Sequence, residues 1–183
     1  MFRNLEGPLT VELYGPWKSE INKLTRAGYN IRQGALIGQR KAGTRLEKLV
    51  KSHLQNQDLG LKKLTEKYLK RKTGAGLNSG ILVSTGAYLG AIDTWQENYT
   101  QYVGVRRGKL DRTAYYKSGG KRRIEIAEVA TINELGNALG RPPRRPLWAT
   151  SLKELGGVKG IRDIVTQSIY TNLRNKGYNV DWT

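Results

Sequence analysis

The stretch Arg45-Leu-Glu-Lys-Leu-Val-Lys-Ser-His-Leu54 carries the clearest periodic pattern in this chain. Its apolar residues and its histidine stand at positions 46, 49, 50, 53 and 54. Spacings of three and four place such side chains on one face of an α-helix. The pattern predicts a long helical segment, roughly Ile31 to Gln57, whose second half buries that face against a core.

Helical patterns also precede and follow this segment. Trp17 to Ala27 predicts a short helix that Gly28 ends as a C-cap. Leu61 to Lys72 predicts a lysine-rich helix, and Ser84-Thr-Gly86 opens a short one with Ser84 or Thr85 as its N-cap. Three more helices are expected toward the C-terminus, at Glu128–Leu135 with Gly136 at its end, Leu147–Leu155 and Val158–Asn175.

Three segments have the character of β-strands. Residues 8–14 alternate apolar and polar, residues 91–106 are rich in Thr, Trp, Tyr and Val, and Ile124 and Ile126 flank Glu125. We expect the last two segments to pair as a long β-hairpin through a basic arm at about 106–123. The predicted fold class is α+β: a small antiparallel sheet with a long β-hairpin, packed against N-terminal and C-terminal helices in a single domain over 1–183.

Composition narrows the classes of function. The chain has 183 residues, no cysteine and one histidine, which excludes a disulfide framework, a thiolate nucleophile and a cysteine-type zinc site. A net charge of +17 predicts contact with an acidic partner such as nucleic acid or an acidic protein. No apolar run is long enough to span a bilayer and no signal peptide is visible, so we expect a soluble protein in a reducing cytoplasm.

Few residues are candidates for catalysis. His53 lies on the apolar face of its helix, which favours a partly buried structural histidine. Glu125, Glu128 and Glu134 are the acids to weigh as paired carboxylates of a nuclease or glycosidase, but their order matches no metal motif. The glycine-rich loop 76–80 lacks the Gly-Lys-Ser/Thr of a phosphate-binding loop. The sequence therefore predicts that the protein is not an enzyme and that it takes no cofactor and no metal.

The basic arm has two interpretations. It places eight Lys and Arg residues around Tyr115 and Tyr116 against the single acid Asp111. Such a segment can grip a phosphate backbone and stack on bases, or it can dock against an acidic neighbouring subunit. The candidate contacts to DNA or to an acidic partner are Arg106, Arg107, Lys109, Arg112, Lys117, Lys121, Arg122 and Arg123.

A proline-rich strip, Arg141-Pro-Pro-Arg-Arg-Pro146, connects two of the predicted helices. Proline fixes φ and removes a donor, so the strip keeps its shape and Arg144 and Arg145 project from a rigid mount. Because Leu147-Trp148 follows at once, we interpret the strip as a seam against other chains, the alternative being an inert rigid turn.

Two stretches carry a family resemblance. They are Ile81-Leu-Val-Ser-Thr-Gly-Ala-Tyr-Leu-Gly-Ala-Ile92, and the segment 126–136 followed by Arg141-Pro-Pro-Arg-Arg-Pro-Leu147. Their order and spacing, within about residues 58–155, resemble the tail-completion or virion-morphogenesis proteins of tailed bacteriophages, also called the head–tail joining or minor tail component group. The positions that match are Ile81, Leu82, Thr85, Gly86, Ile92, Glu134, Gly136, Pro143, Arg145 and Pro146. The positions that depart are Tyr88 and Leu135, where the family has Leu and Phe, and Ala91 and Leu147, where it has Ser and Phe.

The resemblance implies a structural virion protein without a catalytic centre. Such proteins form homo-oligomeric rings, usually hexameric, at the phage neck or tail terminus, where they complete the tail and join it to the head. The implied partners are copies of the chain, head-completion or connector proteins and tail-tube proteins, near genomic double-stranded DNA and away from membranes; assembly takes place in the host cytoplasm. The charge leaves sequence-independent DNA binding open as an alternative function.

The residues of the resemblance suggest where a ring would form its contacts. We expect Glu134 at one subunit's helix end to pair with Arg144 or Arg145 of the next, with Trp148 and Tyr88 as apolar anchors. The predicted subunit-interface residues are Tyr88, Glu134, Arg141, Arg144, Arg145 and Trp148. The predicted structural-turn residues are Thr85, Gly86, Gly136, Pro143 and Pro146.

Overall fold

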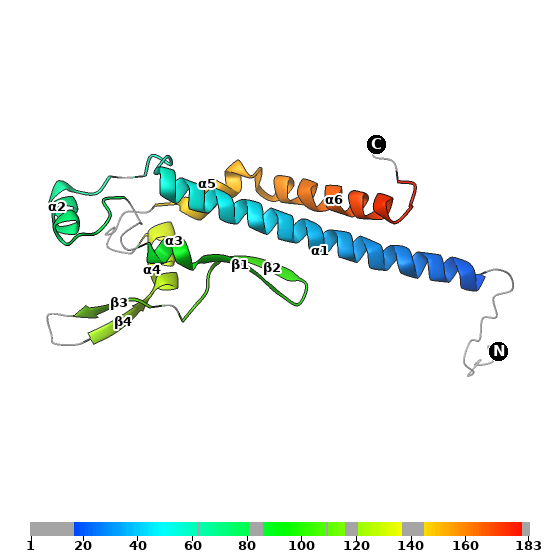
Figure 1. The fold of residues 1–183 in the computed structure, drawn as a ribbon, viewed down its shortest axis with the longest axis horizontal. Coiled ribbons are helices and arrows are strands. Elements are labelled where there is room, and N and C mark those ends of the chain that lie inside the picture. The colour runs from blue at the N-terminus through cyan, green and yellow to red at the C-terminus, as the bar shows by residue number, and fades with distance from the viewer. Residues whose placement is uncertain are drawn as a thin grey trace, which may run out of the picture.

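A computed structural model describes residues 17–61, 63–80, 86–108, 110–115, 121–136 and 145–180. One long helix, α1, extends along most of the molecule, and the other elements are arranged beside its C-terminal half and along one flank (Figure 1). In chain order the elements are α1 (Trp17–Asn56), α2 (Glu66–Gly74), α3 (Ala87–Ala91), β1 (Ile92–Glu97), β2 (Thr100–Val105), β3 (Leu110–Tyr115), β4 (Lys121–Glu125), α4 (Ile126–Leu135), α5 (Leu147–Glu154) and α6 (Gly157–Asn175).

The helix α1 is continuous over 40 residues, so the prediction that Gly28 ends a first short helix was wrong. A glycine inside a helix costs about 1 kcal/mol relative to alanine. The hydrogen bonds of the turns on both sides outweigh that cost, because a helix that is already formed gains one bond for each further residue. Gly28 is therefore an interior residue of α1.

The helix α6 packs antiparallel against α1 at very short range. A methyl group added at Gly34 would lie 2.7 Å from the Cα of Ile169, and one added at Gly38 would lie 2.5 Å from the Cα of Val165. Ser168, between these two α6 residues, is buried. Only glycine at these two α1 positions lets the backbones approach so closely. The pair Gly34 and Gly38, four residues apart, therefore sets the position of α6.

The main core lies at the C-terminal half of α1. Val50 and Leu54 are 0% and 1% exposed, which confirms the apolar face predicted over residues 45–54. Half-buried Leu46 packs against the same cluster. The buried members of this core are Val50, Leu54, Tyr88, Ala91, Ile92, Ile126 and Leu147, so α1, α3, β1, α4 and α5 all contribute to it.

The strands form two separate antiparallel hairpins. β1 pairs with β2 from Ile92↔Val105 to Glu97↔Thr100, and β3 pairs with β4. The predicted single hairpin was thus wrong in its pairing: residues 92–105 turn back on themselves, and the basic arm is a second hairpin. Asn98, with φ of 54°, supplies the left-handed turn residue that closes the first hairpin. The α+β class, with a small antiparallel sheet packed against helices, is confirmed.

The first hairpin is attached to α1 through side chains on both elements. Arg40 Nε donates a hydrogen bond of 3.0 Å to Gln96 Oε1. A methyl group at Gly43 would lie 3.0 Å from side-chain atoms of both Gln101 and Thr94, so the hairpin also rests on a glycine of α1. This contact positions β1 and, directly before it, α3.

Helix boundaries in the rest of the chain follow local capping. α2 begins at Glu66 rather than at Leu61, because Thr65 is its N-cap and accepts a 3.4 Å hydrogen bond from the backbone of Tyr68. α4 begins at Ile126, two residues before the predicted Glu128 and at a residue predicted to lie in a strand; its end before Gly136 agrees with the prediction, and α5 and α6 lie where expected. The predicted strand 8–14 and the segment 81–83 lie outside the described residues, as do Ser84 and Thr85. The N-cap of α3 is Gly86, so the prediction of Ser84 or Thr85 in that role was wrong.

The glycine contact between α1 and α6 predicts opposite effects for the same substitution at two places in α1. Gly38→Ala lowers the free energy of unfolding by about 1–3 kcal/mol, because the new methyl group pushes the α6 backbone away. Gly28→Ala raises it by up to about 1 kcal/mol, because nothing lies within 4 Å and alanine favours the helix. Chemical denaturation measures both; equal effects would contradict the packing.

Candidate functional site

The carboxylate of Glu134, near the end of α4, binds the start of α5. Its Oε2 accepts hydrogen bonds from the backbone N–H of Leu147 at 2.8 Å and of Trp148 at 3.0 Å, and its Oε1 accepts one from Ala149 at 2.9 Å. The first N–H groups of a helix have no partner within the helix, and a negative charge is favourable there. Glu134 thus fixes α5 to α4 within one chain.

Tyr88 and Trp148 join α3 to the same junction. Trp148 Nε1 donates a 3.2 Å hydrogen bond to the hydroxyl of Tyr88. Burial raises the pKa of Tyr88 to about 12, and the nearby charge of Glu134 acts in the same direction. Tyr88 is only 7% exposed, so little of its surface is left for a neighbouring subunit, while Trp148 is half-buried.

The side chain of Arg145 is buried, whereas the sequence predicted that it projects from a rigid strip. It is 7% exposed. Its backbone N–H donates to the carbonyl of Asn133 at 2.6 Å, and its Nη1 donates to Asn133 Oδ1 at 3.2 Å. Both bonds hold the chain just before α5 against the end of α4. The role of Glu134 and Arg145 in a subunit interface stays a prediction. Their hydrogen bonds within the chain, which join α4 to the start of α5, were not predicted from the sequence.

Three of the predicted turn residues can be placed. Gly86 is the N-cap of α3 with φ of 77°, and a methyl group there would meet nothing within 4 Å, so the constraint is the left-handed backbone and not crowding. Gly136 ends α4, also with φ of 77°, and Pro146 is the N-cap of α5. Thr85 and Pro143, like the interface candidates Arg141 and Arg144, lie outside the described residues.

The basic residues of the arm are divided between the two hairpins. Arg106, directly after β2, packs against β1: its guanidinium lies 4.8 Å from the ring centroid of Trp95 and its Nε lies 3.8 Å from Asp93 Oδ2. In the second hairpin the backbone pairs Ala114 with Arg122 and Thr113 with Arg123. The backbone of β3 and β4 likewise places Arg112 and Lys121 in that hairpin, while Lys109 and Lys117 lie outside the described residues.

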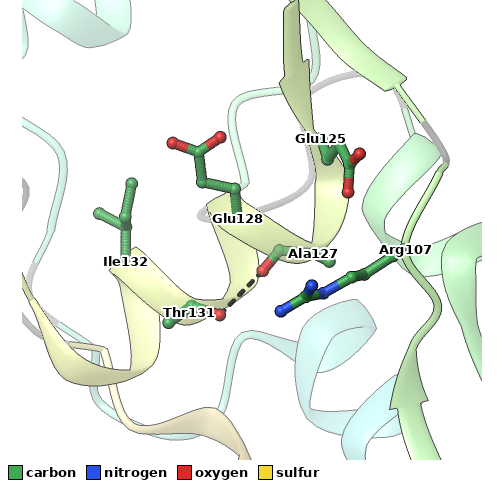
Figure 2. A pocket seen from close by; sticks show the side chains of 6 residues that line it. All are labelled: Arg107, Glu125, Ala127, Glu128, Thr131 and Ile132. Carbon is green, nitrogen blue, oxygen red and sulfur yellow. Dashed lines mark hydrogen bonds between the residues drawn. The ribbon is translucent and has the colours of Figure 1, made fainter.

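A pocket of about 410 Å³ lies between the start of the basic arm and α4 (Figure 2). Arg107, Glu125 and Glu128 are its charged lining residues. Glu125 Oε2 accepts a 3.2 Å hydrogen bond from the backbone of Gly108, and Figure 2 shows the carboxylate of Glu128 pointing in a different direction. Of the three acids considered for catalysis, Glu125 and Glu128 thus line one pocket, but their carboxylates point in different directions. The carboxylate of Glu134 accepts hydrogen bonds from the backbone of α5.

His53 is buried, as its position on the apolar face predicted. Its Nδ1 lies 2.7 Å from Asp58 Oδ1 in a hydrogen bond. Its Nε2 lies 3.0 Å from Glu154 Oε2, but without the alignment of a hydrogen bond. The ring therefore lies between two carboxylates and connects the end of α1 with α5, which the sequence pattern did not predict.

In the part of the chain that the structure describes, no group of three or more His, Cys, Asp and Glu residues is arranged to hold a metal ion. Among the same residues, no helix combines the length and apolar character needed to cross a membrane. No protein-family model, no curated protein and no solved structure matches the chain.

The three backbone hydrogen bonds to Glu134 predict a large effect of removing its carboxylate. Glu134→Ala lowers the free energy of unfolding by about 1–2 kcal/mol, because the first N–H groups of α5 lose their acceptor. Glu134→Gln retains one acceptor oxygen and loses less. Glu128→Gln makes the same change in charge on the same helix away from α5. Thermal unfolding of the three variants measures the difference; an equal loss in Glu128→Gln and Glu134→Gln would contradict the cap.

The buried hydroxyl of Tyr88 predicts a loss of stability at high pH. An unfolded tyrosine ionises near its ordinary value of 10, but Tyr88 in the fold stays neutral until about 12. The unfolded state therefore gains favour as pH rises between these values, by up to about 2–3 kcal/mol. Urea denaturation across this window compares the chain with Tyr88→Phe, whose stability falls less. Parallel curves for the two proteins would show that Tyr88 ionises as an exposed tyrosine.

Proposed function

We propose that this chain is a structural assembly protein of a tailed-phage neck or tail terminus, which forms a ring with its own copies, completes the tail and joins it to the head. The observation that carries the proposal is a row of exposed apolar side chains on the N-terminal half of α1, Ile21, Leu24 and Ile31, which we call the open face of α1. The resemblance in residues 81–92 and 126–147 supports the same proposal.

The open face consists of three exposed apolar residues. Ile21, Leu24 and Ile31 are 52%, 73% and 44% exposed. Their spacings of three and seven keep them on one side of the helix. Ile31 stands three residues before Gly34 and seven before Gly38, so the open face lies near the side of α1 that contacts α6, and its three residues nevertheless remain exposed. Three exposed apolar side chains on one side of a helix favour contact with another chain.

A second copy of this chain is a suitable occupant because further exposed apolar side chains lie elsewhere on the molecule. A ring needs two different surfaces that meet head to tail. Leu135, at the end of α4, and Val158, at the start of α6, are 69% and 81% exposed. Figure 1 places α4 toward the end of the molecule opposite the start of α1, whereas α6 runs back along α1. The open face of one copy and these further side chains of the next are the contacts we propose.

Charge gives the proposal a characteristic dependence on salt. Each copy carries a net charge of +17, so copies repel one another at low ionic strength. Added salt screens that repulsion and leaves apolar contacts intact. Ring formation is therefore favoured by salt.

Sequence-independent DNA binding is the second candidate, and the second hairpin is the observation that favours it. β3 and β4 bring Arg112, Lys121, Arg122 and Arg123 together in two short paired strands. In Figure 1 this hairpin extends away from α1 and α6. Contacts between such cations and phosphates release counterions, so DNA binding weakens steeply with salt, in the opposite direction to ring formation.

Leu24→Asp tests the open face. The variant stays monomeric between about 0.1 M and 1 M salt, where the unchanged chain forms a ring at the higher concentration, because a charge on the open face is costly to bury. Asn22→Asp adds the same charge to another exposed position of α1 and still assembles. Light scattering with size-exclusion chromatography measures the mass, and electron microscopy shows the ring.

Two results would reject the proposed ring. One is a chain that stays monomeric at every salt concentration and also in the presence of tail tubes. The other is a monomer at high salt that binds duplex DNA tightly at low salt, which would favour the second candidate. DNA binding is measured by fluorescence anisotropy in the same salt series.

A further inference from the structure

The helix α2 adds little to the core and carries a dense positive charge. Its sequence is Glu66-Lys-Tyr-Leu-Lys-Arg-Lys-Thr-Gly74, and none of these residues belongs to the main core. Glu66 is the single acid among residues 63–80, against five Lys and Arg residues. A helix with so few apolar residues gains little from burial, so the charged surface of α2 is the feature that a function would use.

Buried Lys72 determines which side of α2 faces the solvent. Its side chain is 6% exposed, and its Nζ donates a 2.5 Å hydrogen bond to the carbonyl of Gly80. The backbone N–H of Leu77 donates to the carbonyl of Lys72 at 3.1 Å. The segment after the helix thus folds back against Lys72. Half-buried Leu69, three residues earlier, lies on the same side of the helix.

Lys67, Lys70 and Arg71 lie on the opposite side, and we call them the cationic face of α2. Their spacings of three and four place them together, about half a helical turn from the side of Leu69 and Lys72. All three side chains are exposed. Among the described residues, no acid forms an ion pair with any of them. The face therefore presents three positive charges to the solvent.

The chemistry of this face fits a nucleic-acid backbone better than an acidic protein. Protein interfaces depend on apolar and aromatic anchors that become buried in a pocket of the partner. The one aromatic side chain of α2 is Tyr68, which is 45% exposed and has the guanidinium of Arg71 at 6.0 Å from its ring centroid. A phosphate backbone needs no apolar anchor, because cations gain affinity by releasing its counterions.

A duplex fits this face better than a single strand. Proteins that bind single strands stack successive bases on several aromatic rings, and α2 has only Tyr68. We propose that the cationic face of α2 binds the phosphate backbone of double-stranded DNA, independently of base sequence. This inference does not need the ring; it rests on the second candidate function, DNA binding, and adds a second contact surface to it.

The position of α2 agrees with such a contact. Figure 1 shows α2 and the second hairpin, β3 with β4, toward the same end of the molecule, opposite the start of α1. The cations at that end come from two elements that lie far apart in the sequence. Both attract the same polyanion, so α2 strengthens DNA binding at the end where the hairpin also lies.

Fluorescence anisotropy with a labelled duplex of random sequence, across a salt series, tests the cationic face. We expect Lys67→Gln combined with Lys70→Gln to weaken binding at about 0.1 M salt by about tenfold or more. The slope of log affinity against log salt becomes shallower by about two, because each lost phosphate contact removes about one from it. Lys159→Gln combined with Lys176→Gln removes the same charge at exposed positions near the two ends of α6 and keeps the slope.

Arg122→Gln combined with Arg123→Gln, in the second hairpin, separates this inference from the DNA binding on which it rests. Weaker binding by that variant, with unchanged binding by the α2 variant, would reject the cationic face and leave DNA binding standing. No binding by the unchanged chain at low salt would reject both. An equal loss in the α2 and α6 variants would show that only net charge matters. Tighter binding to a single strand or to an acidic peptide than to the duplex would also overturn the inference.

Discussion

The close contact between α1 and α6 at Gly34 and Gly38 is the constraint on which the rest of this structure depends. It places the backbones of two helices from opposite ends of the chain within van der Waals distance. α5 directly precedes α6, so the same contact positions α5 beside the core half of α1. Glu134 and His53 then reach α5 from α4 and from α1.

Polar side chains connect the smaller helices of this protein in addition to the apolar core that these helices share. Glu134 binds the start of α5, Arg145 binds Asn133 of α4, and Tyr88 of α3 accepts from Trp148. Several residues that the sequence analysis assigned to contacts between subunits therefore have partners in their own chain. Surfaces for other chains are better sought at the open face of α1 and at the exposed apolar residues of α4 and α6.

Features that depend on local side-chain spacing could be predicted from the sequence. Contacts between residues that lie far apart in the sequence could not. The buried face with Val50 and Leu54 and the end of α4 at Gly136 were readable, because side-chain spacing and a left-handed glycine are local signals. The prediction that Gly28 ends a helix was wrong because glycine ends some helices and lies inside others. The binding of Glu134 to α5 was not predictable, since only the folded chain brings residues 134 and 147–149 together. The spacing of Gly34 and Gly38 was a readable signal for a close helix contact that went unused.

The length of α1 has a mechanical consequence. A helix of 40 residues is about 60 Å long. α6 packs antiparallel along α1 from Asn30 to at least Gly38. Bending of α1 over this stretch therefore requires α6 to bend with it, and the paired helices form a stiffer rod than α1 alone.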